Sequence, residues 1–218
     1  GTNDEGRAML QIVHDLAPKA QLFFATGNGG PGNFANNIIQ LRNTYHCDII
    51  IDDLSYFNEP VFEDGTVAQA VNNVTANGCL YFSSAANSGS VLRGSAGVWE
   101  GDFNDAGSLP FTGGSKVGTI HNFGTISSPL NGDIITVAGS QLYTLAWSDK
   151  TGSSSNDYDL FLVSASGTVK AASTTVQNGS GAPYEQINVP ALVSGDRLVV
   201  FKAASAQVRA ISINTNRG

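Results

Sequence analysis

The chain of 218 residues carries 18 acidic and 11 basic side chains, a formal net charge of −7, and only 13% of its residues are charged. Its length allows one large domain or two small ones, and its 41% of hydrophobic residues are enough for packed cores. The acidic balance argues against nucleic acid as a partner, because binding a phosphate backbone needs a basic face. We also expect no membrane partner, because no apolar run approaches the length of a transmembrane helix.

Glycine, serine, threonine and asparagine are abundant, which is typical of a secreted or extracytoplasmic protein with many turns. No signal peptide is visible, and the abrupt start at Gly1 is consistent with an excised fragment. Cys47 and Cys79 each directly precede a predicted strand. If those strands are adjacent and parallel, a disulfide is sterically allowed. The favoured alternative is two buried free thiols.

Residues 1 to about 97 alternate between helical and strand-like patterns, which predicts an α/β fragment with a parallel sheet over residues 1–107. The predicted helices are Arg7–Leu16, a segment from Pro31 through Leu41, and Thr66–Ala76. The predicted strands are Gln21–Ala25, Asp48–Ile51 and Leu80–Ser84. Because helices and strands follow one another in turn, we expect right-handed crossover connections.

Residues 108–218 are expected to form a separate all-β sandwich domain that is jelly-roll-like. The helical period vanishes from about Lys116, and short strands follow, broken by Gly, Ser, Asn and Pro turns. These strands are Ile134–Val137, Gln141–Trp147, Asp157–Val163, Thr168–Ala172, Glu185–Val189, Arg197–Lys202 and Val208–Ile213. Residues 90–115 are interpreted as the connection between the two domains.

Three polar segments of the first domain are expected to meet at one edge of the sheet. They are residues 4–7 (Asp-Glu-Gly-Arg), 52–55 (Asp-Asp-Leu-Ser) and 84–89 (Ser-Ala-Ala-Asn-Ser-Gly). The first opens a helix, and the other two follow apolar strands. Open α/β folds place their sites where the carboxyl ends of strands meet the N-termini of helices.

The order and spacing of these segments resemble the subtilisin-like serine peptidases, the subtilase and sedolisin superfamily. Residues 5–9 lead through a helix to residues 16–22 (Leu-Ala-Pro-Lys-Ala-Gln-Leu), which is similar to the second catalytic segment of that family. Residues 48–55 resemble the next strand, which usually ends in Ser-Leu-Gly and hydrogen-bonds the bound peptide. Residues 78–89 resemble the strand that ends in Ala-Ala-Gly-Asn-x-Gly.

The resemblance implies a distinct role for Asn87, which matches the asparagine whose side chain donates to the oxyanion. Ala86 stands where that motif usually has glycine. An amide donor at a strand-to-loop elbow suits the stabilisation of a tetrahedral intermediate. The alternative is an asparagine that merely tolerates a turn conformation.

Glu5 occupies the position of the catalytic histidine, and in the related sedolisins the base is a glutamate. Sedolisins also place an aspartate one turn later, where this chain has Met9. The alternative for Glu5 is an ordinary acid in the first turn of a helix, where it complements the helix dipole.

Asp53 falls where the serine of Ser-Leu-Gly stands and is expected to point into the catalytic cleft, with Asp52 on the other face of the strand. We expect Glu5 and Asp53 to form a carboxyl pair that shares a proton. The alternative is that one acid caps a helix while the other binds backbone amides. Leu54 and Ser55 are the predicted contacts to the bound peptide.

These assignments predict the central fragment of a secreted serine endopeptidase that acts on polypeptides. A subtilase also needs an early strand that ends in aspartate and a Gly-Thr-Ser helix with the nucleophile, and neither motif is present. The fragment alone is therefore expected to be inactive. A non-catalytic pseudo-peptidase or adhesion module remains the alternative function.

The β-rich half resembles the jelly-roll modules attached to secreted bacterial peptidases, through residues 147–149 (Trp-Ser-Asp) and 156–160 (Asn-Asp-Tyr-Asp-Leu). No cofactor is required by the peptidase mechanism, but calcium would suit four oxygen ligands in this region. They are Asp149, Asn156, Asp157 and Asp159. The favoured alternative is that these are solvated turn acids and a charge that protects a strand edge.

Residues 27–32 (Gly-Asn-Gly-Gly-Pro-Gly) also match the glycine pattern of dinucleotide-binding folds, with Asp52 farther along the chain. Such a loop would hold phosphates at a helix N-terminus. A dinucleotide-binding domain is therefore a third, less favoured function.

Overall fold

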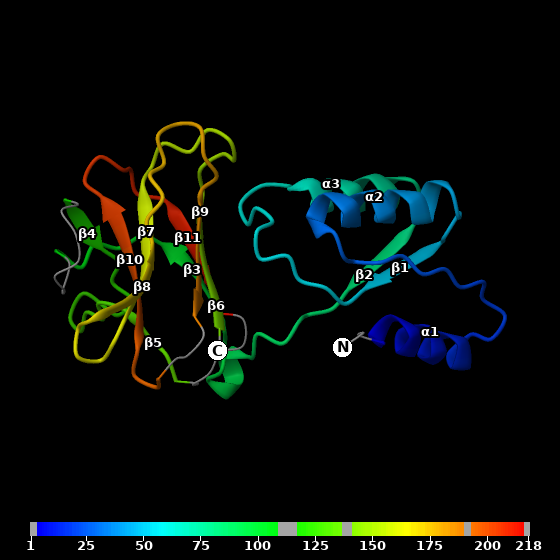
Figure 1. The fold of residues 1–218 in the computed structure, drawn as a ribbon, viewed down its shortest axis with the longest axis horizontal. Coiled ribbons are helices and arrows are strands. Elements are labelled where there is room, and N and C mark those ends of the chain that lie inside the picture. Colours follow the sequence, from blue (N-terminus) through cyan, green and yellow to red (C-terminus); the bar gives the residue numbers. More distant parts are fainter. Residues whose placement is uncertain (1–3, 109–116, 137–140, 190–192, 216–218) are drawn as a thin grey trace. The chain divides into compact units, whose positions relative to one another are not determined.

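The computed structural model describes residues 4–108, 117–136, 141–189 and 193–215. The fold is mixed and rich in β-sheet, with few helices and mostly antiparallel strand pairing (Figure 1). The chain divides into two compact units. Unit 1 comprises Gly1–Glu59 and Asp64–Ala86, and unit 2 comprises Pro60–Glu63 and Asn87–Gly218.

Unit 1 is built from three helices and a parallel pair of strands. In chain order these are α1 (Glu5–Leu16), α2 (Gly30–Asn43), β1 (Ile49–Asp52), α3 (Thr66–Ala76) and β2 (Leu80–Ser83). The predicted parallel pairing of the strands at residues 48–51 and 80–84 is confirmed, since β1 and β2 are parallel, with Ile50 opposite Tyr81 and Asp52 opposite Ser83. Helices α2 and α3 pack on the face that carries Ile50, around a core of Ala35, Ile38, Ile50, Ala70, Val74 and Cys79.

The parallel sheet of unit 1 does not extend beyond these two strands in the described residues. The predicted strand Gln21–Ala25 is wrong, because the segment forms neither helix nor strand. A strand needs a neighbour to satisfy its backbone hydrogen bonds, and the described chain places none beside this segment. Apolar sequence alone was therefore a poor guide here.

Local sequence explains where the helices of unit 1 begin and end. At the start of α2, Gly29 and Gly30 adopt positive φ angles of 100° and 84°, and Pro31 occupies the first turn, where its missing N–H is not needed. At the end of α3, Gly78 has a φ of 83° and the Cys79 amide donates to the Val74 carbonyl (3.1 Å). This left-handed ending satisfies carbonyls that the helix leaves free.

The second face of the parallel pair is open. Ile49, Ile51, Leu80 and Phe82 lie on it and are 54%, 49%, 58% and 56% exposed. Parallel strands are usually covered on both faces. Unit 1 therefore presents an apolar surface, here called the open sheet face, that no described residue of the unit buries.

Unit 2 contains two antiparallel sheets. Its elements are the short helix η1 (Val91–Arg93) and strands β3 (Val98–Asp102), β4 (Gly118–Ile120), β5 (Asp133–Ile134), β6 (Gln141–Trp147), β7 (Tyr158–Val163), β8 (Val169–Ser173), β9 (Tyr184–Val189), β10 (Arg197–Ala203) and β11 (Ala210–Asn214). One sheet has the order β4-β10-β7-β8, with β5 also paired to β10, and the other has the order β3-β11-β6-β9.

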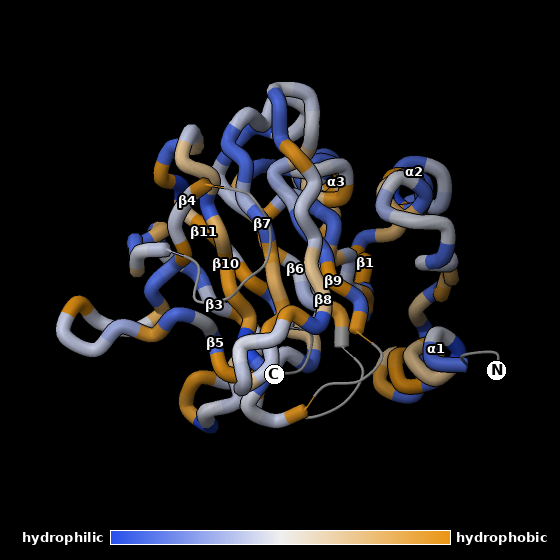
Figure 2. Tube along the Cα trace, turned by 60° about the vertical axis from the view of Figure 1, so that its left-hand side comes forward, coloured by the Kyte–Doolittle hydropathy of each residue, from blue (hydrophilic) through white to orange (hydrophobic). Residues whose placement is uncertain are grey.

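The two sheets enclose the main core of unit 2 between them. Its largest buried side chains come from both sheets and include Trp147, Tyr143, Tyr158, Leu160 and Ile213. Figure 2 shows the hydrophobic residues running along the central strands β7, β10 and β6. Strand β7 is buried on both faces, because Phe161 and Val163 join a second apolar cluster on the outer side of their sheet.

The boundary between the units lies earlier than the predicted one at residues 107 and 108. Strand β3 pairs with β11 in full register, from Ala210 opposite Asp102 to Asn214 opposite Val98. Pairing with the last strand of the chain places β3 in unit 2, and the division falls after Ala86. None of the described helices is long and apolar enough to span a membrane.

Candidate functional site

The carboxyl end of β1 carries an organised polar cluster, formed by Asp52, Tyr81 and Ser83. The Ser83 hydroxyl donates to Asp52 Oδ1 at 2.8 Å, and the Tyr81 hydroxyl donates to Asp52 Oδ2 at 2.5 Å. Both donors come from β2, directly across the parallel pair. Burial raises the pKa of Tyr81, and the adjacent Asp52 adds to the shift, so that the phenol stays protonated and donates.

Sequence reasoning missed this cluster because it selected the neighbouring aspartate. Asp52 lies on the same face as Ile50, two residues earlier, and that face is set by the strand period. The register that brings Ser83 opposite Asp52 is a property of the folded pair. The signal in the sequence was the alternating Tyr81 and Ser83 on the partner strand.

The predicted carboxyl pair of Glu5 and Asp53 stays a prediction. Glu5 is exposed in the first turn of α1, and Asp53 is exposed just after β1. Two carboxylates must share a proton only where water does not screen them from one another. In the described structure each residue faces solvent, and Leu54 and Ser55 are exposed beside Asp53.

The elbow after β2 has an unusual backbone. Ala86 has a positive φ of 57°, and among the described residues only His46 shares this feature outside glycine. The left-handed region suits glycine, which is the residue that the subtilisin-like motif resembled by this segment has at this place. Asn87 follows directly, is exposed, and is the first residue of the second stretch of unit 2.

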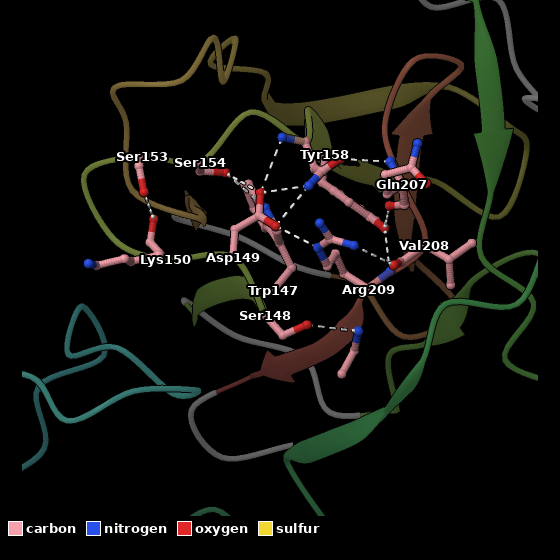
Figure 3. Close-up of polar contacts among 12 residues, drawn as sticks. Trp147, Ser148, Asp149, Lys150, Ser153, Ser154, Tyr158, Gln207, Val208 and Arg209 are labelled. Carbon is pink, nitrogen blue, oxygen red and sulfur yellow. Dashed lines mark hydrogen bonds and ion pairs between the residues drawn. The ribbon is translucent and has the colours of Figure 1, made fainter.

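The four predicted calcium ligands do not form one site. Asp149 lies at the centre of a polar network (Figure 3), where Arg209 Nε donates to Oδ1 at 2.6 Å and Ser154 donates to Oδ2 at 2.9 Å. Asn156 donates to both carboxylate oxygens through its side chain, at 2.8 and 2.9 Å. Burial raises the pKa of Asp149, but these hydrogen bonds outweigh it and hold the pKa below its ordinary value.

The Asp149 network joins distant parts of unit 2. Ser154 also accepts from the Trp147 indole at 3.2 Å, and Asn156 Oδ1 accepts from the Gln207 amide at 2.7 Å. The Asp149 carboxylate is 8% exposed and already paired with a guanidinium. We therefore assign Asp149 and Asn156 a structural role in this arrangement.

Asp159 lies elsewhere, near a second buried acid, Glu185 of β9. Asp159 and Glu185 are 0% and 1% exposed. Glu185 accepts a hydrogen bond from the Gln177 side chain, through Nε2, at 3.0 Å and another from the Ser173 hydroxyl of β8. The backbone N–H of Gln177 donates to Asp157 at 3.3 Å. Burial raises the pKa of Glu185, and the charge of Asp159 adds to this, against the effect of the hydrogen bonds.

No group of three or more His, Cys, Asp or Glu side chains within the described ranges could hold a metal ion. Calcium binding therefore stays a prediction. The two cysteines are free thiols. Burial raises the pKa of both Cys47 and Cys79, which keeps them protonated and poorly nucleophilic at neutral pH.

A buried histidine forms part of the core of unit 2 and was not singled out from the sequence. His121 is 0% exposed and is surrounded by the rings of Trp99, Phe103 and Phe123, at centroid distances of 4.7, 5.4 and 4.6 Å. Its Nδ1 accepts a hydrogen bond from the backbone N–H of Asn104 at 3.0 Å. Burial lowers the pKa of His121 to about 4, so the ring is neutral at physiological pH.

The glycine-rich loop before α2 is held by its own side chains. Asn33 Nδ2 donates to the Asn28 carbonyl at 2.7 Å, and Asn37 Nδ2 donates to the Thr26 carbonyl at 2.8 Å. In the described part of the chain no strand precedes the loop, whereas a dinucleotide fold has one there. Of the strand and the helix that flank the glycine loop in a dinucleotide fold, the described residues therefore provide only the helix, α2.

No family model matches the chain, and neither does any curated protein. Among solved structures, an arabinose-bound α-L-arabinofuranosidase, MgGH51, is 16% identical over a match that covers 55% of this chain and 21% of that chain. The TM-score is 0.25, and a likeness of this size carries no argument about fold or function.

Proposed function

We propose that the chain is the central part of a secreted, subtilisin-like serine endopeptidase, with unit 2 as an inserted jelly-roll-like module. The observation that carries the proposal is the elbow after β2, where Ala86 takes a positive φ directly before Asn87. Strained backbone of this kind clusters at functional sites. The parallel pair of β1 and β2, joined through α3, supports the same assignment.

In this proposal the chain supplies part of the machinery. Glu5 takes the proton from the serine hydroxyl as it attacks the scissile carbonyl, and the Asn87 amide donates to the developing oxyanion. Asp53 is the partner carboxylate of Glu5, while Leu54 and Ser55 contact the extended substrate. The nucleophilic serine comes from a segment that this chain does not contain, so the chain alone does not hydrolyse peptides.

The open sheet face supports the view that further segments belong to this fold. Ile51 and Phe82 are half-exposed in unit 1, at 49% and 56%. In a complete parallel α/β domain such side chains lie beneath a helix.

The test compares hydrolysis of a protein substrate by the intact protein with that of its Glu5→Gln and Asn87→Ala variants. Loss of the oxyanion donor is expected to lower kcat by about a hundredfold to a thousandfold with little change in KM. Asn73→Ala, which removes an exposed amide from α3, serves as the control and should leave kcat unchanged. Equal activity of Glu5→Gln and the parent would refute the base assignment, and absence of any turnover would favour the pseudo-peptidase.

A further inference from the structure

Asp52 is a half-buried carboxylate with no cation beside it. Within the described residues, no lysine, arginine or histidine nitrogen forms an ion pair with Asp52. Arg42 of α2 binds Asp48 (3.3 Å) and the Asn77 carbonyl (2.7 Å) at the opposite end of β1. Among the described residues, the negative charge at the carboxyl end of β1 therefore has neutral hydrogen-bond donors beside it and no positive charge.

The two hydroxyl donors hold the carboxylate in one orientation. Ser83 donates to Oδ1 at 2.8 Å and Tyr81 donates to Oδ2 at 2.5 Å. The one further hydrogen bond to these oxygens from the described residues is long, from the Leu54 backbone amide to Oδ1 at 3.4 Å. Because each carboxylate oxygen has two acceptor positions, both oxygens retain capacity for a further donor.

The same hydrogen bonds decide what kind of ligand the cluster accepts. The Ser83 hydroxyl donates its one hydrogen bond to Asp52, so its oxygen can only accept a hydrogen bond from a ligand. A ligand must therefore bring several N–H or O–H donors and, to balance Asp52, a positive charge. Guanidinium and ammonium groups meet both requirements, and a guanidinium also matches a carboxylate edge with two parallel bonds.

We propose that the Asp52–Tyr81–Ser83 cluster binds the cationic side chain of an arginine or lysine in a bound polypeptide. The proposal rests on the proposed function for the polypeptide nature of the ligand, because residues 53–55 beside the cluster are the predicted peptide contacts. The preference for a cation rests on the cluster itself. The cluster thus selects basic residues, a specificity that the peptidase assignment does not supply.

Access and affinity are consistent with a recognition site. Ser83, Asp53 and Leu54 are exposed, so a ligand can reach the carboxylate from solvent. Exposed ion pairs are worth little, mainly because two mobile side chains must be ordered. Here Asp52 is already ordered by its donors, which removes part of that cost. A single side chain bound in this way is expected to bind weakly, with a dissociation constant of about a millimolar or higher.

The experiment titrates the intact protein with N-acetyl-arginine methylamide and follows backbone amide resonances by NMR. Saturable shifts are expected at the ends of β1 and β2, and the uncharged N-acetyl-norleucine methylamide should give none. Asp52→Asn should weaken arginine binding at least about tenfold, whereas Asp48→Asn, which removes the same charge at the opposite end of β1, should change it less than about twofold. Equal losses in both variants, or no saturable shift in the parent protein, would overturn the proposal.

A second variant guards against a folding defect in Asp52→Asn. Tyr81→Phe removes one donor but keeps the carboxylate, so arginine binding should persist while the thermal stability falls. Loss of binding in Tyr81→Phe, which retains the Asp52 carboxylate, would contradict the assignment of that carboxylate as the group that holds the cation.

Peptide cleavage separates the two proposals from each other. Arginine binding without any hydrolysis by the intact protein would leave the cation site standing and remove the peptidase. Hydrolysis with equal kcat/KM for arginine and norleucine peptides, in the parent and in Asp52→Asn, would leave the peptidase standing and remove the cation site.

Discussion

At Ala86 a single methyl group is held in a backbone conformation that disfavours it. Its φ of 57° brings Cβ close to the following carbonyl, which costs about 1 kcal/mol. Ala86 is exposed, so its methyl group contributes little packing in return. Relief of this strain outweighs the cost of about 0.5 kcal/mol that a freer glycine brings, so we expect Ala86→Gly to raise the free energy of unfolding by about 0.5 kcal/mol, measured by urea titration with circular dichroism.

Ala85 provides the matched control for this substitution. It is exposed, directly precedes Ala86, and has no positive φ. Ala85→Gly should lower stability by about 0.5 kcal/mol, because it only adds freedom to the unfolded chain. If Ala86→Gly and Ala85→Gly both lowered the stability, the backbone of Ala86 would not be strained.

His121 makes the stability of unit 2 depend on pH. Its pKa is lowered to about 4 in the folded protein, against an ordinary value of 6.5, so the unfolded state binds the proton first. The stabilisation is complete above pH 6.5 and is lost as the pH falls toward 4, by about 3 kcal/mol in total. Urea unfolding followed by the fluorescence of Trp99 and Trp147, both in unit 2, measures this loss.

The contribution of His121 is isolated by two variants. His121→Phe should remove about 3 kcal/mol of pH dependence between pH 6.5 and 4, although it also leaves the Asn104 amide without its acceptor and lowers stability at pH 7. Gln11→Ala, at an exposed position of α1 and without an ionisable group, should keep the pH profile of the parent. An unchanged profile in His121→Phe would assign the acid sensitivity to carboxylates instead.

At the level of elements, periodic apolar runs were sufficient to predict most helices and strands, and pairing decided the rest. Helix α3 and strand β6 have the predicted bounds, Thr66–Ala76 and Gln141–Trp147. Strand β3, Val-Trp-Glu-Gly-Asp, has two acids and a glycine, and it exists because β11 supplies its hydrogen bonds. Gln21–Ala25 shows the converse, since it is apolar but has no partner.

At the candidate site, too, the local sequence predicts one part of the arrangement and strand pairing decides the other. Chain order alone placed the Asp-Asp segment at the end of β1, since strand ends collect at one edge of a parallel sheet. Which aspartate meets Tyr81 and Ser83 depends on register and on side-chain direction across two strands. Neither quantity is contained in the local pattern of residues 48–55.

Glu185 joins strands β8 and β9 through Ser173 and is expected to weaken the fold at high pH. Burial and the nearby Asp159 raise its pKa, so the folded state holds the proton more tightly than the unfolded state. The stability that this provides is complete below the ordinary pKa of a glutamate and falls as the pH rises through the folded value. Glu185→Gln should therefore be increasingly more stable than the parent as the pH rises from 5 to 8.

Gln186→Ala, one residue after Glu185 on β9, is the control for this comparison, because Gln186 is exposed and carries no ionisable group. Its stability difference from the parent should not change with pH over the same range. A flat difference for Glu185→Gln would contradict the raised pKa.

The Asp149 network is expected to stabilise unit 2 without a metal ion. Asp149→Asn leaves the Arg209 guanidinium, which is 33% exposed, without its counter-charge and should lower the free energy of unfolding by about 2 kcal/mol. The loss should be the same in millimolar calcium and in chelator, because the guanidinium already provides the positive charge. A calcium-dependent difference would return Asp149 to the role of a metal ligand.

At the scale of the whole molecule, the two units differ in how completely they bury their apolar residues. Unit 2 encloses its core between two sheets, with Trp147, Tyr143 and Leu145 fully buried. Unit 1 buries one face of its strand pair and leaves the open sheet face to solvent. A fold of this kind gains little from Ile51 and Phe82 as long as nothing covers them.

The proposed larger peptidase makes a prediction about this face that depends on the length of chain studied. In the 218-residue chain, Phe82→Ser should change the free energy of unfolding by less than about 1 kcal/mol, because the ring is half-exposed. In the intact protein, where further segments are proposed to cover the face, the same change should cost about 3 kcal/mol through the lost packing. Ile126→Ser, at a fully exposed position of unit 2, should have the same small effect in both lengths of chain. Equal effects of Phe82→Ser in the two would mean that the face stays open, and the central-fragment proposal would then lose its support from unit 1.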